Sequence, residues 1–236
     1  RRHVWSDNLF RRIYAPRVPQ KLPRYLTVKE VRRLLTVPDT SDPKGMRDRA
    51  ILEVLYGSGV RVSELVGLDL RDVDLATGEL RVIGKGDKER ITLLGRPGIR
   101  ALKRYIEQGR PEQIKDHAPD AVFLNRLGGR LSSRSVDTIV RKAGNAAGIE
   151  QTVTPHLLRH TFATHMLDGG ADLRVVQELL GHENIATTQI YANVTQRRER
   201  EIYLGAHPGA RDSESAVGDE LGPLDNENEA EPGSAS

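Results

Sequence analysis

Apolar residues recur at three- and four-residue intervals along most of the chain, which is the spacing of amphipathic α-helices. The first run follows Leu26, where Thr27 and Glu30 form a capping-box sequence and Leu26 can pack on Val31. We expect further helices over residues 46–56, 60–65, 97–108, 134–147, 155–168, 172–180 and 195–204.

Shorter runs between these helices predict a small antiparallel sheet. Its strands are expected at residues 73–75, 80–83 and 90–94, with a further short strand at 121–124. The turn between the second and third strands is rich in glycine and carries Lys85 at its tip. The fold class that follows is α+β, mainly α-helical.

The region from Thr154 to Val194 is predicted to contain two amphipathic helices that carry several histidine and arginine side chains, followed by a tyrosine. Thr154 can cap a helix whose first position is Pro155, where a missing N–H is tolerated. At 100° per residue, one face of this helix holds His156, Arg159, His160 and Ala163, and the opposite face holds Leu158, Phe162 and Met166. The next helix can end at Gly181, so His182 follows a helix end and Tyr191 comes nine residues later.

The formal net charge of +3 conceals two parts of opposite sign. Residues 211–236 hold one basic and eight acidic residues, so residues 1–210 carry 35 basic against 25 acidic residues, a net +10. A basic body suits a polyanionic partner, because each phosphate contact releases counterions. The alternative is a surface that is charged only for solubility.

Composition divides the chain into three parts. Residues 1–26 read as an extended basic linker with prolines at 16, 19 and 23, and residues 27–210 contain the predicted helices and strands. Residues 211–236 have almost no large apolar side chains, so we expect a disordered acidic tail. No apolar run approaches the ~20 residues of a membrane span, and no signal peptide is evident. The absence of cysteine fits a cytosolic setting.

Several reaction classes find no support in the sequence. Neither a GxxxxGK[ST] phosphate loop nor a GxGxxG sequence after a strand is present, so nucleotide-driven chemistry is not indicated. His156, His160 and His165 invite a zinc interpretation, but no HExxH sequence accompanies them and His165 falls on the other side of the helix. We therefore expect neither a metal nor a cofactor.

Six residues could together perform metal-free phosphoryl transfer: Arg61, Lys85, His156, Arg159, His182 and Tyr191. Two guanidinium groups could hold nonbridging oxygens, the other cationic groups could move protons, and a tyrosine could attack. Each residue also has an ordinary interpretation. Arg61 and Glu64, at i and i+3, could be a surface ion pair, Lys85 a solubility residue, and Tyr191 a packing residue.

A resemblance to a known family favours the catalytic interpretation. The stretch HLLRHTFATHMLDGGADLRVVQELLGHENIATTQIYANV, with GSGVRVSEL and VIGKGDKER upstream, closely resembles the tyrosine recombinase/integrase family, and within it the Xer-type recombinases. The similarity runs from about Pro23 to about Ala210. It implies a tyrosine recombinase catalytic domain in which the small sheet bears the lysine hairpin.

The resemblance also implies a role for each residue. Tyr191 would attack a DNA phosphodiester to form a 3′-phosphotyrosine, Arg61 and Arg159 would hold the nonbridging oxygens, and His182 would assist them. His156 would be the general base and Lys85 the general acid, while Glu64 would support the arginines and His160 would be structural. The implied activity is site-specific DNA recombination without metal or ATP, in chromosome dimer resolution or integration.

The expected partner is a double-stranded DNA recombination site, bound in a homo- or hetero-tetramer of recombinase subunits in the cytoplasm and associated with the nucleoid. A DNA translocase is a further expected partner, and a helix after the nucleophile would dock on a neighbouring subunit. Ala192-Asn193 and Leu93 depart from the Xer pattern, and we expect the family's N-terminal DNA-clamping domain to be absent from this chain. A type IB topoisomerase and a catalytically silent DNA-binding module are the competing hypotheses.

Overall fold

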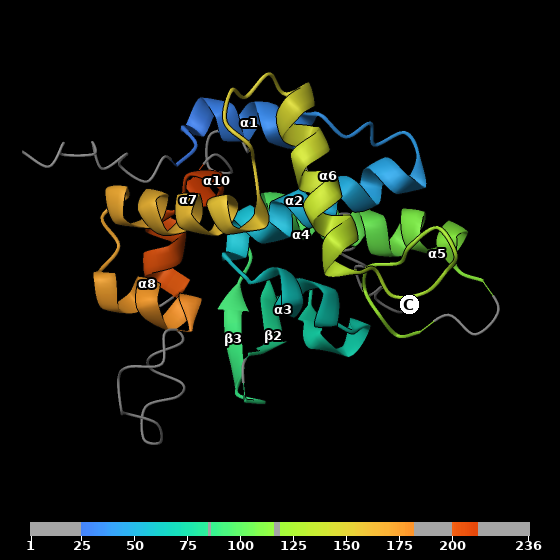
Figure 1. Ribbon diagram of the computed structural model, residues 1–236. Coiled ribbons are helices and arrows are strands. Elements are labelled where there is room, and N and C mark those ends of the chain that lie inside the picture. The colour runs from blue at the N-terminus through green and yellow to red at the C-terminus, as the bar shows by residue number, and fades with distance from the viewer. Residues whose placement is uncertain (1–24, 85, 116–118, 182–199, 212–236) are drawn as a thin grey trace, which may run out of the picture.

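A computed structural model describes residues 25–84, 86–115, 119–181 and 200–211 of the chain. Figure 1 shows a mainly helical arrangement with one small sheet. The described elements are α1 (Val28–Thr36), α2 (Pro43–Ser58), α3 (Val62–Gly67), η1 (Leu70–Asp72), β1 (Val73–Asp74), β2 (Glu79–Ile83), β3 (Glu89–Leu93), α4 (Arg96–Arg104), η2 (Tyr105–Gly109), α5 (Arg110–Gln113), α6 (Ser133–Ala146), α7 (Pro155–Asp168), α8 (Leu173–Leu180) and α10 (Pro208–Arg211).

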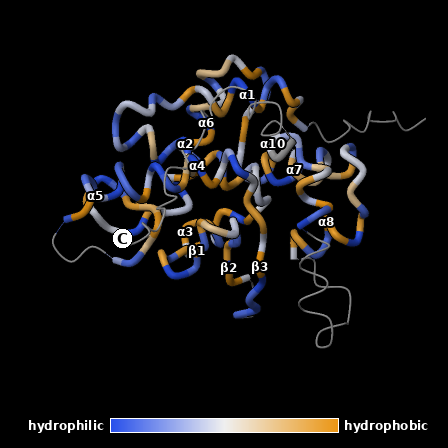
Figure 2. The backbone as a smooth tube through the Cα atoms, turned by 180° about the vertical axis from the view of Figure 1, so that it is seen from behind, coloured by the Kyte–Doolittle hydropathy of each residue, from blue (hydrophilic) through white to orange (hydrophobic). Residues whose placement is uncertain are grey.

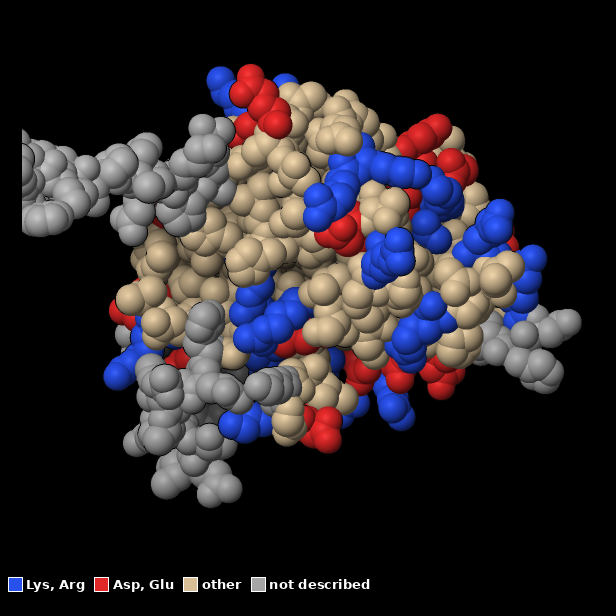
Figure 3. All heavy atoms as spheres, viewed as in Figure 1, with Lys and Arg blue, Asp and Glu red and all other residues tan. Residues whose placement is uncertain are grey.

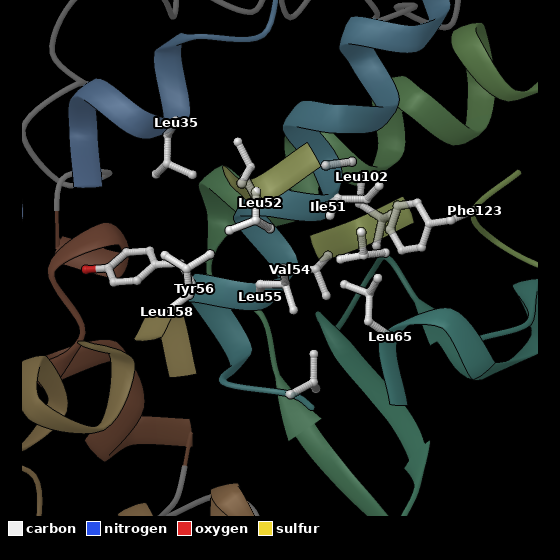
Figure 4. Packing of buried hydrophobic residues seen from close by; sticks show 14 of the residues in the cluster. Leu35, Ile51, Leu52, Val54, Leu55, Tyr56, Leu65, Leu102, Phe123 and Leu158 are labelled. Atoms are coloured by element: carbon white, nitrogen blue, oxygen red, sulfur yellow. The ribbon is translucent and has the colours of Figure 1, made fainter. Parts of the chain in front are cut away.

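Helix α2 forms the centre of the fold. Asp42 caps it by accepting from the N–H of Gly45 at 2.8 Å, and its residues from Ala50 to Ser58 are all buried. Figure 4 shows its side chains meeting Leu65 of α3, Leu102 of α4 and Leu158 of α7. Burial on every side explains why this second half of the helix is largely apolar.

The sheet is antiparallel in the order β1-β2-β3, as predicted, and Val82 pairs with Arg90 in its register. Hydrophilic positions gather at the β2–β3 hairpin tip, away from the hydrophobic positions of the packed elements (Figure 2). The tip is closed by the N–H of Gly84, which donates to the carbonyl of Lys88 at 2.8 Å.

A second apolar cluster lies beside the main core. Residues 200–206 form a further helix, and this cluster packs it against α7 and α8. Its members include Phe162, Met166, Leu179, Leu180 and Tyr203. Leu158 belongs to the main core, so α7 connects the two clusters. Its predicted apolar face is confirmed.

Three predicted elements differ from the structure. Residues 121–124 form only isolated bridges, because the Arg110 and Arg47 side chains donate to the carbonyls of Ala121 and Leu124 where a strand would. The helix predicted at 97–108 changes at Tyr105 to a wider π-helical turn. The helix predicted at 195–204 is described from residue 200 and reaches 206, and Pro208 begins a further short helix, α10.

The described helices include none that is long and apolar enough to cross a membrane.

Candidate active site

Arg61 stands where α2 ends and α3 begins. Gly59 ends α2 in the left-handed conformation (φ 61°), and a Cβ there would lie 2.4 Å from the ring of Phe162. The backbone N–H of Arg61 donates to Oε2 of Glu64 at 2.7 Å, and its Nη1 donates to Oε1 at 3.0 Å. The predicted Arg61–Glu64 pair is therefore present, with the Arg61 side chain 43% exposed.

Glu64 is buried and also holds Arg90, an arginine outside the predicted set of site residues. Arg90 lies on β3 and donates through Nη1 and Nη2 to the two carboxylate oxygens at 2.6 and 2.9 Å. Burial alone would raise the pKa of Glu64, but hydrogen bonds from Arg90 and Arg61 outweigh it and hold that pKa below its usual value. Glu64 is thus an ionised carboxylate between two arginines.

Arg159 reaches the same place from α7. Its Nη1 donates to the carbonyl of Gly59 at 2.5 Å and its Nη2 to the carbonyl of Leu180 at 2.6 Å. Burial lowers the pKa of Arg159 to about 10, and the charges of Arg61 and Arg90 act in the same direction while Glu64 opposes them. The guanidinium remains protonated at neutral pH.

The three guanidinium groups and one carboxylate form what we call the arginine cluster: Arg61, Glu64, Arg90 and Arg159. Figure 3 shows basic side chains gathered where α7, α8 and β3 meet. The cluster carries more positive than negative charge, and the Arg61 side chain, which is 43% exposed, makes part of this charge accessible to solvent. Such a site can bind an anion through planar, multidentate donors.

The histidines of α7 have different surroundings. His156 is exposed three residues before Arg159, which puts both on one side of the helix, and His160 is partly buried. His165 is buried, with its Nδ1 3.0 Å from the hydroxyl of Tyr56. The described part of the chain contains no group of three His, Cys, Asp or Glu side chains that could hold a metal ion.

Lys85, His182 and Tyr191 lie outside the described residues, so their predicted roles stay predictions. Two of their neighbours in sequence are described. A Cβ on Gly84 would lie 3.6 Å from Oε1 of Glu64, and the carbonyl of Gly181 lies 3.5 Å from Nη2 of Arg61. The chain therefore passes the arginine cluster immediately before Lys85 and immediately before His182.

Comparisons with known proteins identify a family. Residues 24–198 match the Phage integrase family. The chain is 50% identical over 200 residues to tyrosine recombinase XerC of Natranaerobius thermophilus, covering 83% of this chain and 67% of that protein.

Solved structures agree with that result. The XerA recombinase has a TM-score of 0.63 at 36% identity, covering 79% of this chain and 65% of the XerA chain. XerH bound to a palindromic difH substrate in a post-cleavage complex has a TM-score of 0.59 at 30% identity, covering 78% of this chain and 53% of the XerH chain. The chain thus spans about two thirds or less of the length of these three proteins.

Proposed function

This chain belongs to the phage integrase family, as a tyrosine recombinase of the Xer type, and we propose that it cleaves and rejoins DNA strands in site-specific recombination. The observation that carries the proposal is the meeting of Arg61 and Arg159 at the end of α8. Arg61 and Gly181 are 120 residues apart in sequence, yet the fold brings them into contact. This convergence is what a site for one phosphate needs.

The two arginines have different positions around that phosphate. Arg61 is partly exposed and keeps guanidinium N–H groups available beyond its contacts with Glu64 and Gly181. Arg159 is more buried and is fixed by the carbonyls of Gly59 and Leu180. We assign both to the nonbridging oxygens, with His182 assisting.

The chemical step transfers a phosphoryl group from one oxygen to another. Tyr191 attacks phosphorus, its phenol proton passes to His156, and a 3′-phosphotyrosine bond forms as the bond to the 5′-oxygen breaks. Lys85 donates a proton to the departing 5′-oxygen. Attack by the 5′-hydroxyl of a partner strand reverses the step, so the phosphoester bond is conserved and no ATP is consumed.

The partner that we propose is a double-stranded recombination site, bound by a homo- or hetero-tetramer of subunits. The structure of XerH bound to a palindromic difH substrate supports a DNA partner. We retain residues 27–210 as the catalytic domain, between a basic linker (1–26) and an acidic tail (211–236). A place in the cytoplasm with the nucleoid follows from a chromosomal target. Chromosome dimer resolution, with a DNA translocase as partner, and integration are the two biological roles that fit this chemistry.

A nicked suicide substrate tests the proposal, because the short fragment after the cut diffuses away and traps a covalent adduct. We expect the purified chain to form an adduct stable to denaturing electrophoresis, and Tyr191→Phe to form none. Tyr25→Phe is the matched control, because Tyr25 is an exposed tyrosine on the far side of α7 that contacts His165, and it should keep the adduct.

Other outcomes separate the competing functions. Absence of an adduct with the wild-type chain would indicate a DNA-binding module without catalysis. An adduct that persists in Tyr191→Phe would overturn the choice of nucleophile. Relaxation of supercoiled DNA without strand exchange between two sites would favour a topoisomerase.

A further inference from the structure

Arg90 is the arginine of the cluster that has no assigned part in the reaction. Its side chain is 14% exposed, against 43% for Arg61. Both of its Nη atoms donate to Glu64, and its Nε donates to the carbonyl of Leu179 at 3.2 Å. All three nitrogens of this guanidinium are therefore engaged by the protein.

The end of α8 connects Arg90 with the two arginines assigned to the phosphate. Its last carbonyls each accept from a different guanidinium: Leu179 from Arg90, Leu180 from Arg159 and Gly181 from Arg61. A helix C-terminus carries partial negative charge, so it attracts all three cations. Three arginines that are far apart in sequence thus donate to consecutive carbonyls at the end of α8.

We propose that Arg90 is a positioning residue for DNA cleavage. It occupies both carboxylate oxygens of Glu64 and holds the end of α8, so that Arg61 and Arg159 stay directed at the phosphate. This inference rests on the proposed function and adds a residue to it. Arg90 itself does not touch DNA in this proposal, because its side chain is only 14% exposed and each of its three nitrogens already donates to the protein.

Competition for Glu64 is the physical reason. A buried carboxylate must be neutralised and hydrogen-bonded, and Arg90 supplies two of the bonds that do this. Without Arg90, Glu64 would draw the whole guanidinium fork of Arg61 into a bidentate pair. Arg61 would then turn away from the phosphate, even though it is still present and charged.

The main alternative is that the Arg90–Glu64 pair serves only to hold the fold together. The two roles differ in what happens when the charge of Glu64 is removed as well. A positioning role predicts that Glu64→Gln restores cleavage in Arg90→Gln, because a neutral amide no longer captures Arg61. A purely structural role predicts that the second substitution recovers only the folded fraction, because it removes an unpaired buried charge, and that the folded chains of both variants cleave at the wild-type rate.

The test measures the single-turnover rate of adduct formation at saturating nicked DNA, together with the Kd for that DNA. We expect Arg90→Gln to slow adduct formation about 100-fold, as a small misplacement of reacting groups does, while the Kd changes only a few-fold. Arg90→Gln/Glu64→Gln should return to within about tenfold of the wild-type rate. Circular dichroism at the assay temperature establishes that each variant is folded.

Two further variants keep the test decisive. Arg90→Lys preserves the charge but lacks the planar fork, so it should fold and should still be slower than wild type by about tenfold. Arg81→Gln is the matched control: Arg81 lies on the neighbouring strand β2 and pairs with Asp72 at 3.0 Å, outside the cluster, and we expect its rate to equal that of wild type.

Each result has one meaning. Wild-type rates in Arg90→Gln or Arg90→Lys, or a double variant no faster than Arg90→Gln, would overturn the positioning role. Failure of the wild-type chain itself to form an adduct would instead overturn the proposed function.

Discussion

Two clusters of ionisable groups flank α7, and they accommodate buried members in opposite ways. In the arginine cluster the groups stay charged, and one buried carboxylate pairs with two of the three guanidinium groups. The second, which we call the histidine cluster, consists of Tyr56, His165, Tyr203 and His207 and lies between α2, α7 and the chain after residue 200.

The histidine cluster keeps its members neutral. His207 stacks on Tyr203 with ring centroids 5.2 Å apart, and its Nδ1 accepts from the N–H of Gly209 at 3.2 Å. Burial lowers the pKa of His207 to about 3, and the neighbouring His165 acts in the same direction. Within the described residues, its Nε2 has no hydrogen-bond partner.

The position of Tyr56 explains how one scaffold supports both environments. Its ring packs at the edge of the main core while its hydroxyl points away from the other labelled side chains, towards α7 and the C-terminal part of the chain (Figure 4). Arg159 and His165 lie six residues apart on α7 and point into different clusters. The arginine cluster is therefore destabilised when a charge loses its partner, whereas the histidine cluster is destabilised when a charge is added.

Removing the carboxylate from the arginine cluster should have the largest effect on stability. Glu64→Ala leaves Arg90 and Arg61 without their anion, and we expect the free energy of unfolding to fall by about 3–5 kcal/mol, as in other broken buried ion pairs. Urea titration followed by circular dichroism measures it. Glu107→Ala, in an exposed pair with Lys103 at 3.8 Å, is the control and should change stability by about 0–1 kcal/mol. Equal effects in the two variants would mean that the arginine cluster contributes no more than a surface pair.

The histidine cluster can be disturbed sterically through Gly169. A Cβ on this residue would lie 2.0 Å from the backbone oxygen of Ala206, so Gly169→Ala must displace the chain that carries Tyr203 and His207. We expect a loss of about 1–3 kcal/mol in the free energy of unfolding, the usual range for overpacking.

Gly205→Ala is the matched control for that displacement. Nothing lies within 4 Å of a Cβ at this position, and alanine favours a helix by up to about 1 kcal/mol. It should be neutral or stabilising in the same urea titration. A Gly169→Ala chain as stable as wild type would show that the 200–206 helix does not pack as described.

Acidification should weaken the histidine cluster by a smaller amount. Because the pKa of His207 is lowered in the folded state, its contribution to stability is complete above its ordinary pKa of about 6.5 and is lost as the pH falls below that value. Between about pH 7.5 and about pH 5.5 this amounts to a loss of about 1.4 kcal/mol. His165, whose pKa is also lowered, acts with the same sign.

Unfolding titrations at the two pH values measure this dependence. His207→Phe keeps a ring in the cluster and removes the titration, so most of the loss should disappear, whereas His160→Gln, outside the cluster, should retain it. The Tyr56, Tyr203 and Phe162 rings that face His207 carry no charge at these pH values. An unchanged pH dependence in His207→Phe would contradict the origin that we assign.

Local sequence predicted much of the structure. The Thr27–Glu30 capping box, the Thr154 helix cap and the left-handed Gly181 are all present, because caps and turns depend on residues within one helical turn. The same holds for the Arg61–Glu64 pair, which spans three residues of one helix start. In these cases the partner is close in sequence, so the pattern of residues was sufficient.

Arg90 shows where such reasoning ends. Arg90 lies on the side of β3 that faces the protein, whereas its apolar neighbour Ile91 faces solvent and is 39% exposed. A charged residue inside and an apolar residue outside reverse the usual arrangement, and this could have drawn attention to Arg90. Its partners, however, are Glu64 and Leu179, which lie 26 and 89 residues away. The spacing of apolar and polar residues cannot predict contacts between residues so far apart in sequence. For the same reason it did not predict that arginine side chains would bond to the backbone of residues 121–124.

The sequence by itself thus determined the family, the helical elements and the chemical types of the predicted site residues. Tertiary structure alone decided that three arginines share one helix end, which of them is open to solvent, and that His165 and His207 are kept neutral. The physical reason is that charge, burial and hydrogen bonding depend on distances in space, and only the folding of α7 and α8 against β3 and α3 sets those distances.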